Sequence, residues 1–221
     1  MPEQQAAGKL LALTFDDGPN TGTTVEILDI LEQYGTAASF FLVGRNITAE
    51  TVPVVRRAYD MGCEIGNHSE THSYLDTLPA AAVMAEVNAV SRKVREITGE
   101  PPHFFRPPYI AVSETMFRCA GLPFIAGFGA DDYLESVTAQ ERYDGVMRQA
   151  QDGAIVLLHD TAGNSQTVTA LRRLIPDLLA AGFSFVTVSE LFRKKGVEPA
   201  PYTLYSLVQP AGPQGTYAED S

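Results

Sequence analysis

The stretch that decides the fold is Lys9-Leu10-Leu11-Ala12-Leu13-Thr14-Phe15-Asp16-Asp17-Gly18-Pro19, an apolar run that stops at two aspartates and a turn. Residues 9–15 have the length of one strand, and the Asp-Gly-Pro sequence after them is a strong turn signal. The run is apolar almost throughout, which is typical of parallel strands covered by helices on both faces. It predicts a buried strand that presents Asp16 and Asp17 at its carboxyl end.

Strand-like and helical patterns alternate about seven times along the chain. Further strands are predicted over residues 37–43, 63–66, 103–106, 124–128, 154–158 and 183–188. Helices are predicted over residues 24–33, 49–59, 78–98, 113–120, 139–149, 167–181 and 189–194. This alternation indicates an α/β fold with a parallel sheet, either a β/α barrel or an open doubly wound sheet.

The chain length of 221 residues suits one domain with a large core and is short for two. We predict an N-terminal arm over 1–8, one domain over 9–193 and a Pro/Gly-rich tail over 194–221. The tail shows no periodicity, so it is either a linker or an arm that packs back on the domain. Cys63 and Cys119 make no disulfide framework, and we expect packed thiols.

The composition is that of an acidic globular protein, with 45% hydrophobic and 19% charged residues and a net charge of −11. An acidic surface argues against nucleic acid or anionic lipid as a partner, since both require basic patches. No run reaches the eighteen apolar residues of a membrane span. The N-terminus lacks the basic start and apolar middle of a signal peptide. We expect a secreted or cell-surface protein whose export signal lies outside this sequence, with a cytoplasmic protein as the alternative.

Unusual polar residues follow five of the predicted strands. These clusters are Asp16-Asp17, Asn67-His68, Arg106, Asp131-Asp132 and His159-Asp160. In barrels and open sheets alike, active sites lie at the carboxyl ends of parallel strands. We therefore expect the five clusters to converge on one site.

One carboxylate and two imidazoles indicate a metal site within these clusters. His68 and His72 are four residues apart, which would place both rings on one side of a helical turn and close enough to share an ion. The Asp16-Asp17 pair taken alone could be only a turn. An Asp and two His form a common ligand set for zinc and other first-row metals, which leaves positions open for water and substrate.

The Arg106-Pro107-Pro108-Tyr109 segment has a structural and a functional interpretation. It could be a rigid loop with an exposed arginine, because the prolines restrict the backbone and remove donors. Alternatively, the stiff backbone holds the guanidinium next to a carboxylate. His103 has no motif around it, and we interpret it as structural.

Four motifs in this order resemble those of the polysaccharide deacetylases, the NodB-like carbohydrate esterase family 4. They are Thr14-Phe15-Asp16-Asp17-Gly18, His68-Ser69-Glu70-Thr71-His72, Arg106-Pro107-Pro108-Tyr109 and Leu157-Leu158-His159-Asp160. The resemblance covers about residues 9–192. It implies that residues 9–193 form a distorted (β/α) barrel of about seven parallel strands and act as a catalytic domain.

The resemblance also assigns roles around the metal. It implies that Asp16 is the general base and that Asp17, His68 and His72 hold one divalent ion. We expect zinc, with cobalt, nickel or manganese as alternatives. Arg106 would hold Asp16 and tune its basicity.

A second set of roles concerns the substrate and the leaving group. The resemblance implies that the backbone N–H of Tyr109 completes an oxyanion hole and that Leu157 lines the pocket for the acetyl methyl group. It implies that His159 is the general acid.

The sequence departs from the family pattern at Asp131-Asp132-Tyr133. The family has an Asp followed by Trp there, and this chain contains no Trp. We align Asp132 with the acid that orients the catalytic histidine, with Asp131 as the alternative. Tyr133 would take the place of the Trp, which keeps an aromatic wall and adds a hydroxyl.

The function implied is hydrolysis of acetyl groups on a polysaccharide or oligosaccharide by a metal-activated water. The segments 124–133 and 185–192 look like clostridial-type deacetylase domains, some of which are joined to xylanases, and favour O-acetyl groups of xylan. The alternative is N-deacetylation of peptidoglycan or chitin-type N-acetylglucosamine. Rival functions are a non-catalytic glycan-binding protein on the same fold and a phosphoesterase, although the latter favours paired metals or basic clamps.

Overall fold

A computed structural model describes residues 8–210 and 215–216, so the predicted arm lies outside the described residues except for Gly8. The strands are β1 (Lys9–Asp16), β2 (Ser39–Leu42), β3 (Glu64–Asn67), β4 (Phe124–Ile125), β5 (Phe128–Gly129), β6 (Ala154–His159), β7 (Phe183–Phe185), β8 (Thr203–Tyr205) and β9 (Gly215–Thr216). The helices are α1 (Thr23–Gln33), α2 (Val52–Asp60), α3 (Ala80–Thr98), α4 (Glu114–Cys119), α5 (Ala139–Gln149), α6 (Ser165–Ala180) and α7 (Val188–Lys195). Short 3₁₀ turns span Gly44–Asn46 and Pro108–Ile110.

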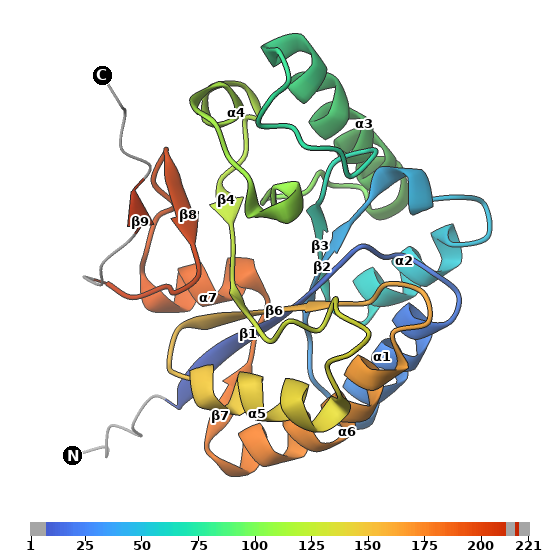
Figure 1. Cartoon of the computed structure of the whole chain (residues 1–221), viewed down its shortest axis with the longest axis vertical. Coiled ribbons are helices and arrows are strands. Elements are labelled where there is room, and N and C mark those ends of the chain that lie inside the picture. Colours follow the sequence, from blue (N-terminus) through green and yellow to red (C-terminus); the bar gives the residue numbers. More distant parts are fainter. Residues whose placement is uncertain (1–7, 211–214, 217–221) are drawn as a thin grey trace.

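The central strand is β1, which confirms the interpretation of the opening apolar run. It pairs in parallel with β2, β6 and β7, and the sheet order is β3-β2-β1-β6-β5. Leu11, Leu13 and Phe15 pack with helices outside the sheet, whereas Ala12 packs with residues of the opposite face. Figure 1 shows β1 and β6 crossing the middle of the molecule beside α1, α5 and α6. Both faces of β1 are therefore buried, as an apolar run without alternation requires.

The barrel continues from β3 through a single residue to β4. Phe105 forms isolated parallel bridges with Asn67 and Phe124, so the strand predicted over 103–106 is reduced to one bridging residue. Prolines at 101, 102, 107 and 108 flank it, and they cannot donate to a ladder. The prediction of a strand over 103–106 was therefore wrong in extent, because only Phe105 pairs with neighbouring strands.

The tail completes the wall between β4 and β6. β8 pairs in parallel with β4, and beyond it Ile155 N–H donates to the carbonyl of Ser206 and Val208 N–H donates to that of Gly153. Tyr205 is 1% exposed, packs on Phe192 with ring centroids 4.9 Å apart, and accepts a bond from Ala200 N–H at its hydroxyl. Residues 203–208 thus pack into the fold, whereas 211–214 and 217–221 lie outside the described residues. The resulting architecture is an α/β distorted barrel, so the open-sheet alternative is excluded.

The segment predicted as one strand over 124–128 divides into β4 and β5. Gly127 lies between them at a φ of 145°, a backbone conformation that residues other than glycine rarely adopt. A Cβ at this position would also lie only 2.8 Å from Cβ of Leu157. The other predicted strands and helices are present with ends shifted by a few residues. Within the described residues no helix is both long and apolar enough to cross a membrane.

The burial of Tyr205 gives a stability prediction. Tyr205→Ala should lower the free energy of unfolding by about 3–5 kcal/mol, because it removes a buried aromatic ring from the barrel wall. Leu179→Ala is the matched control: Leu179 is exposed on α6, so the loss should stay below about 0.5 kcal/mol. Denaturant unfolding measures both. Equal stabilities for Tyr205→Ala and the control would show that the tail is not part of the core.

Candidate active site

A pocket of about 470 Å³ lies at the carboxyl ends of the parallel strands, where the polar clusters were expected to converge. Its walls include nearly all the predicted site residues, namely Asp16, Asp17, His68, His72, Tyr109, Asp132, Tyr133, Leu157 and His159. Arg106 lies directly behind Asp16 and is fully buried. The structure therefore brings every predicted site residue to one place.

Asp17, His68 and His72 have the geometry of a mononuclear metal site. Their ligand atoms all lie within 4.8 Å of one another. Oδ1 of Asp17 is 3.3 Å from Nε2 of His72 and 3.7 Å from Nε2 of His68. Ligands about 2.1 Å from a tetrahedral ion stand roughly 3.4 Å apart, so the three side chains fit one divalent ion with little movement.

Neighbouring groups favour the neutral, metal-binding form of both imidazoles. Nδ1–H of His68 donates to the carbonyl of Arg106 at 2.7 Å, which leaves Nε2 free to bind a metal. Burial and the adjacent His68 lower the pKa of His72 below its ordinary value. The neutral form that a metal requires is thereby favoured.

The prediction that His68 and His72 lie on a helical turn was wrong. Residues 68–72 form a loop in which Ser69 and His72 have positive φ, at 66° and 58°. Ser69 N–H donates to Oδ1 of Asn67, and His72 N–H donates to Oγ of Ser69. These bonds hold the loop in a conformation that still places the two rings 4.8 Å apart.

Asp16 is a buried carboxylate held by a buried guanidinium. Its side chain is 2% exposed, and Nη1 of Arg106 donates to Oδ1 at 2.6 Å. Arg106 also donates to the carbonyl of Ala126 and lies over the ring of Phe41 at 4.2 Å. Burial raises the pKa of Asp16, but the charges of Arg106, His68 and His159 and the Arg106 hydrogen bond bring it below its ordinary value. The carboxylate is therefore ionised at neutral pH.

His159 is oriented by Asp132 and not by Asp131. Nδ1–H of His159 donates to Oδ1 of Asp132 at 2.7 Å, and the backbone N–H of His159 donates to Oδ2 of Asp132 at 2.7 Å. Burial lowers the pKa of His159, but the hydrogen bond and charge of Asp132 outweigh it and raise the pKa to about 9. Asp131 lines the same pocket, yet the bonds place Asp132 in contact with the imidazole.

Three further residues shape the space between these groups. Leu157 belongs to the buried run of β6 and lines the pocket. The ring of Tyr109 lies 4.7 Å from that of His72, and the ring of Tyr133 lies 5.9 Å from that of His159. Tyr133 thus places an aromatic ring beside His159, at the position where the family pattern has a Trp.

Strained backbone is concentrated around the pocket. Non-glycine residues with positive φ in the described chain are Asp17, Ser69, His72, Tyr109, Ile110, Asp131 and Tyr202, and all but Tyr202 belong to the loops that line or adjoin the site. Residues other than glycine rarely adopt a positive φ, and each such residue costs about 1–3 kcal/mol of conformational free energy. Such strain persists only where surrounding contacts hold the loops in one conformation. Loops held in this way are typical of preorganised sites.

Asp160 is a supporting residue to which the sequence assigned no role. It is fully buried, and its carboxylate accepts bonds from Gly18 N–H at 2.9 Å and from the Thr24 hydroxyl at 2.5 Å. A Cβ on Gly18 would collide with this carboxylate. Asp160 therefore fixes the turn that carries Asp17. The signal in the sequence was its position directly after His159, because adjacent residues of an extended chain point to opposite sides.

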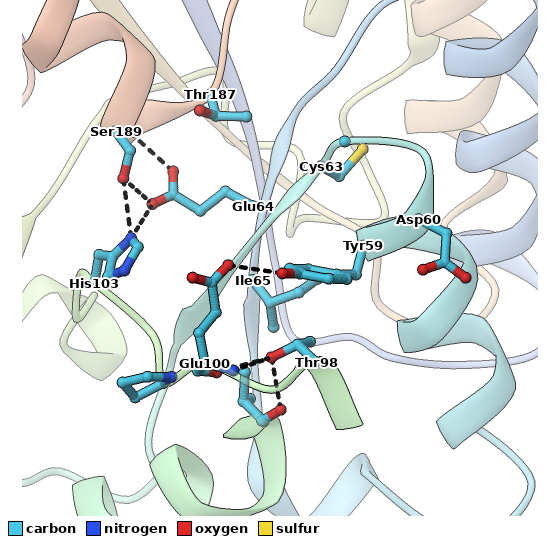
Figure 2. A pocket seen from close by; sticks show the side chains of 13 residues that line it. Tyr59, Asp60, Cys63, Glu64, Ile65, Thr98, Glu100, His103, Thr187 and Ser189 are labelled. Carbon is cyan, nitrogen blue, oxygen red and sulfur yellow. Dashed lines mark hydrogen bonds and ion pairs between the residues drawn. The ribbon is translucent and has the colours of Figure 1, made fainter. Parts of the chain in front are cut away.

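His103, the histidine interpreted as structural, lies outside the site. Figure 2 shows it beside a separate cavity of about 500 Å³, where it approaches Ser189 and Glu64. Nδ1 of His103 is 3.3 Å from Oγ of Ser189, and the Ser189 hydroxyl donates to Glu64. Glu64 also accepts the backbone N–H of Ser189 in the first turn of α7. The cluster therefore ties β3 to α7.

Comparison with known proteins identifies the family. A sequence profile of the polysaccharide deacetylases matches residues 3–122. A bifunctional xylanase/deacetylase of Pseudobutyrivibrio xylanivorans is 45% identical over 202 residues, which cover 91% of this chain and 33% of that protein. A peptidoglycan-N-acetylglucosamine deacetylase of Bacillus cereus is 34% identical over 193 residues, which cover 85% of this chain and 90% of that protein.

The solved structures agree with these relatives. A family 4 acetyl xylan esterase from Clostridium thermocellum, determined in complex with a cobalt ion, matches with a TM-score of 0.88 at 37% identity. The match covers 90% of this chain and 99% of that one. The chain spans a third of the length of the xylanase/deacetylase, so the similarity there is to one part of a longer protein. Profile, sequence and fold agree, and the chain belongs to the polysaccharide deacetylase family.

Proposed function

We propose that this protein is a metal-dependent hydrolase that removes acetyl groups from a carbohydrate polymer. The observation that carries the proposal is the placement of Asp16 and His159 beside the Asp17, His68 and His72 triad. Asp16 and His159 are paired residues of the adjacent strands β1 and β6, so a base and an acid stand next to each other at one pocket. A divalent ion held by the triad would act as a Lewis acid, which would lower the pKa of a water and polarise a carbonyl.

Asp16 is the general base in this mechanism. It accepts a proton from the attacking water, and its low pKa ensures that it is ionised when substrate arrives. Arg106 neutralises the buried charge and prevents the carboxylate from rotating, since one oxygen is bonded to the guanidinium. The second oxygen of Asp16 lies 3.7 Å from Nε2 of His68, on the side of the triad.

His159 is the general acid, and Tyr109 supports the developing oxyanion. Because Asp132 holds Nδ1, the other ring nitrogen of His159 carries the proton for the departing sugar oxygen or nitrogen. The backbone N–H of Tyr109 donates to the oxyanion, and a donor of this kind is worth about 3 kcal/mol. Leu157 offers an apolar surface for the acetyl methyl group.

The substrate that we favour is O-acetylated xylan. Support comes from the xylanase/deacetylase and the acetyl xylan esterase, both of which this chain resembles. The peptidoglycan deacetylase supports the alternative, an N-acetylglucosamine polymer. The metal that we favour is zinc, because one carboxylate and two imidazoles suit it. Cobalt is an alternative, since the esterase structure contains it.

Metal binding and turnover should be separable by mutation. Asp16→Asn should lower kcat by about a thousandfold while the metal content of the purified protein stays near one ion, because the base is lost and the ligands remain. His72→Ala should lose the ion and the activity together. Elemental analysis and acetate release measure the two properties. Full activity in Asp16→Asn would contradict the base, and full metal content in His72→Ala would remove that residue from the ligand set.

The alkaline limb of the pH–rate profile should report His159. The acid works only when protonated, so kcat/KM should fall as pH rises through the pKa of His159, which Asp132 raises. Asp132→Asn removes that charge, and the falling limb should move to lower pH, by about one unit or more. Asp131→Asn is the matched control, since Asp131 lines the pocket without holding the imidazole. Equal shifts in both variants would show that Asp132 has no specific role.

Acetate release decides the substrate. The metal-loaded protein should release acetate from acetylated xylan faster than from N-acetylglucosamine oligomers at equal acetyl concentration. The reverse order would establish the N-deacetylase alternative. Binding of either glycan without any acetate release would instead favour a non-catalytic glycan-binding protein.

A further inference from the structure

Exposed aromatic side chains gather at the rim of the active-site pocket. The most exposed large apolar side chains in the described chain are Tyr74, Met84, Tyr109, Tyr133, Leu134 and Leu179. All three tyrosines of this set line or adjoin the pocket. Exposing aromatic rings to water is unfavourable, and exposed apolar groups that cluster mark binding surfaces.

Two of the tyrosines form one continuous wall on the side of the metal ligands. The rings of Tyr74 and Tyr109 stack with centroids 3.9 Å apart and an interplanar angle of 11°, and they are 55% and 54% exposed. Tyr109 in turn contacts His72. Tyr74 does not line the pocket itself. It therefore extends the wall outward, away from the reacting atoms.

The loop that carries Tyr74 is anchored, so its ring is presented without a large cost in ordering. Leu75 follows directly, is fully buried, and packs in a cluster with Val83 and Phe105. The carbonyl of Tyr74 also accepts a bond from the Thr77 hydroxyl at 3.3 Å. A surface that is already ordered loses less conformational entropy when a ligand binds.

The third tyrosine stands beside the proposed acid His159, whereas Tyr109 stands beside the proposed ligand His72. Tyr133 is 64% exposed and lies next to His159. It also borders a second hollow, of about 340 Å³, which shares Asp17 and Asp132 with the catalytic pocket. Polar side chains line most of the rest of that hollow, namely Glu135, Arg142, Thr161, Asn164, Ser165 and Gln166, and Ala162 and Gly163 complete it. Such a lining suits the hydroxyl groups of a sugar.

We propose that Tyr74, stacked on Tyr109, and Tyr133 seat the sugar rings on either side of the acetylated one. The protein then acts on internal units of a polymer, and Tyr74 is a specificity-determining residue. A sugar ring presents C–H groups on its faces, and these are attracted to the negative face of an aromatic ring. The catalytic groups lie between the two aromatic sides, so an acetyl group that reaches them belongs to the sugar in the middle. The inference rests on the proposed deacetylase function.

The test is the dependence on chain length. For the metal-loaded wild type, kcat/KM for acetate release should rise from the acetylated monosaccharide to the trisaccharide, in the xylan or the N-acetylglucosamine series. Tyr74→Ala should lower kcat/KM on the trisaccharide about fivefold more than on the monosaccharide, chiefly through KM. Tyr74→Phe should restore the chain-length dependence, because it keeps the ring. Leu179→Ala, an exposed apolar residue of α6, should match the wild type on every substrate.

Each outcome decides the proposal. If Tyr74→Ala lowers kcat/KM equally on monosaccharide and trisaccharide, Tyr74 only supports Tyr109, and the proposal is overturned. A wild type with no chain-length dependence would also overturn it. If neither series yields acetate, the deacetylase function fails and calorimetry decides the inference. Trisaccharides must then bind more tightly than monosaccharides, and Tyr74→Ala must abolish that difference.

Discussion

The ion pair between Arg106 and Asp16 is the constraint on which the rest of the site depends. Both side chains are buried, and removing two charges from water costs more than most buried pairs regain. The pair is therefore explained by what it holds in place. The side chain of Arg106 restrains the proposed base, while its carbonyl accepts Nδ1–H of His68 and so presents Nε2 to the metal position. Arg106 therefore links the proposed base to the proposed metal ligands.

The parts of the fold that the sequence predicted are those with local physical signals. β1 and β6 are short apolar runs that stop at charged residues, and such runs cannot be stable outside a covered sheet. Gly99 ends α3 in the left-handed conformation expected of a C-terminal glycine. The convergence of Asp16, His159 and the metal triad followed from parallel strands whose carboxyl ends share one edge. The family pattern favoured Asp132 and left Asp131 as the alternative, and in the structure the bonds to His159 come from Asp132.

The parts that escaped prediction depend on contacts between distant residues. Phe105 is a single bridging residue between prolines. It belongs to the sheet only through its bridges to Asn67 and Phe124, which are distant in the sequence. The loop over 68–72 is shaped by side-chain bonds from Asn67 and Ser69, which override helical spacing. The stack of Tyr74 on Tyr109 joins residues from two segments far apart in the sequence. Neither segment has a periodic pattern from which this contact could be predicted.

The way in which residues 203–208 close the wall has a consequence for the order of assembly. These residues lie between β4 and β6 and come near the C-terminal end of the described chain, so the wall cannot close until nearly all of these residues have been synthesised. Asp17, His68 and His72, by contrast, come from the segments that follow β1 and β3, which β2 joins directly. A nascent chain that has paired only these three strands already brings the three proposed ligands to one edge of the sheet, before Arg106 fixes the ring of His68. An ion bound by these residues would therefore stabilise the partly folded chain before residues 203–208 complete the wall.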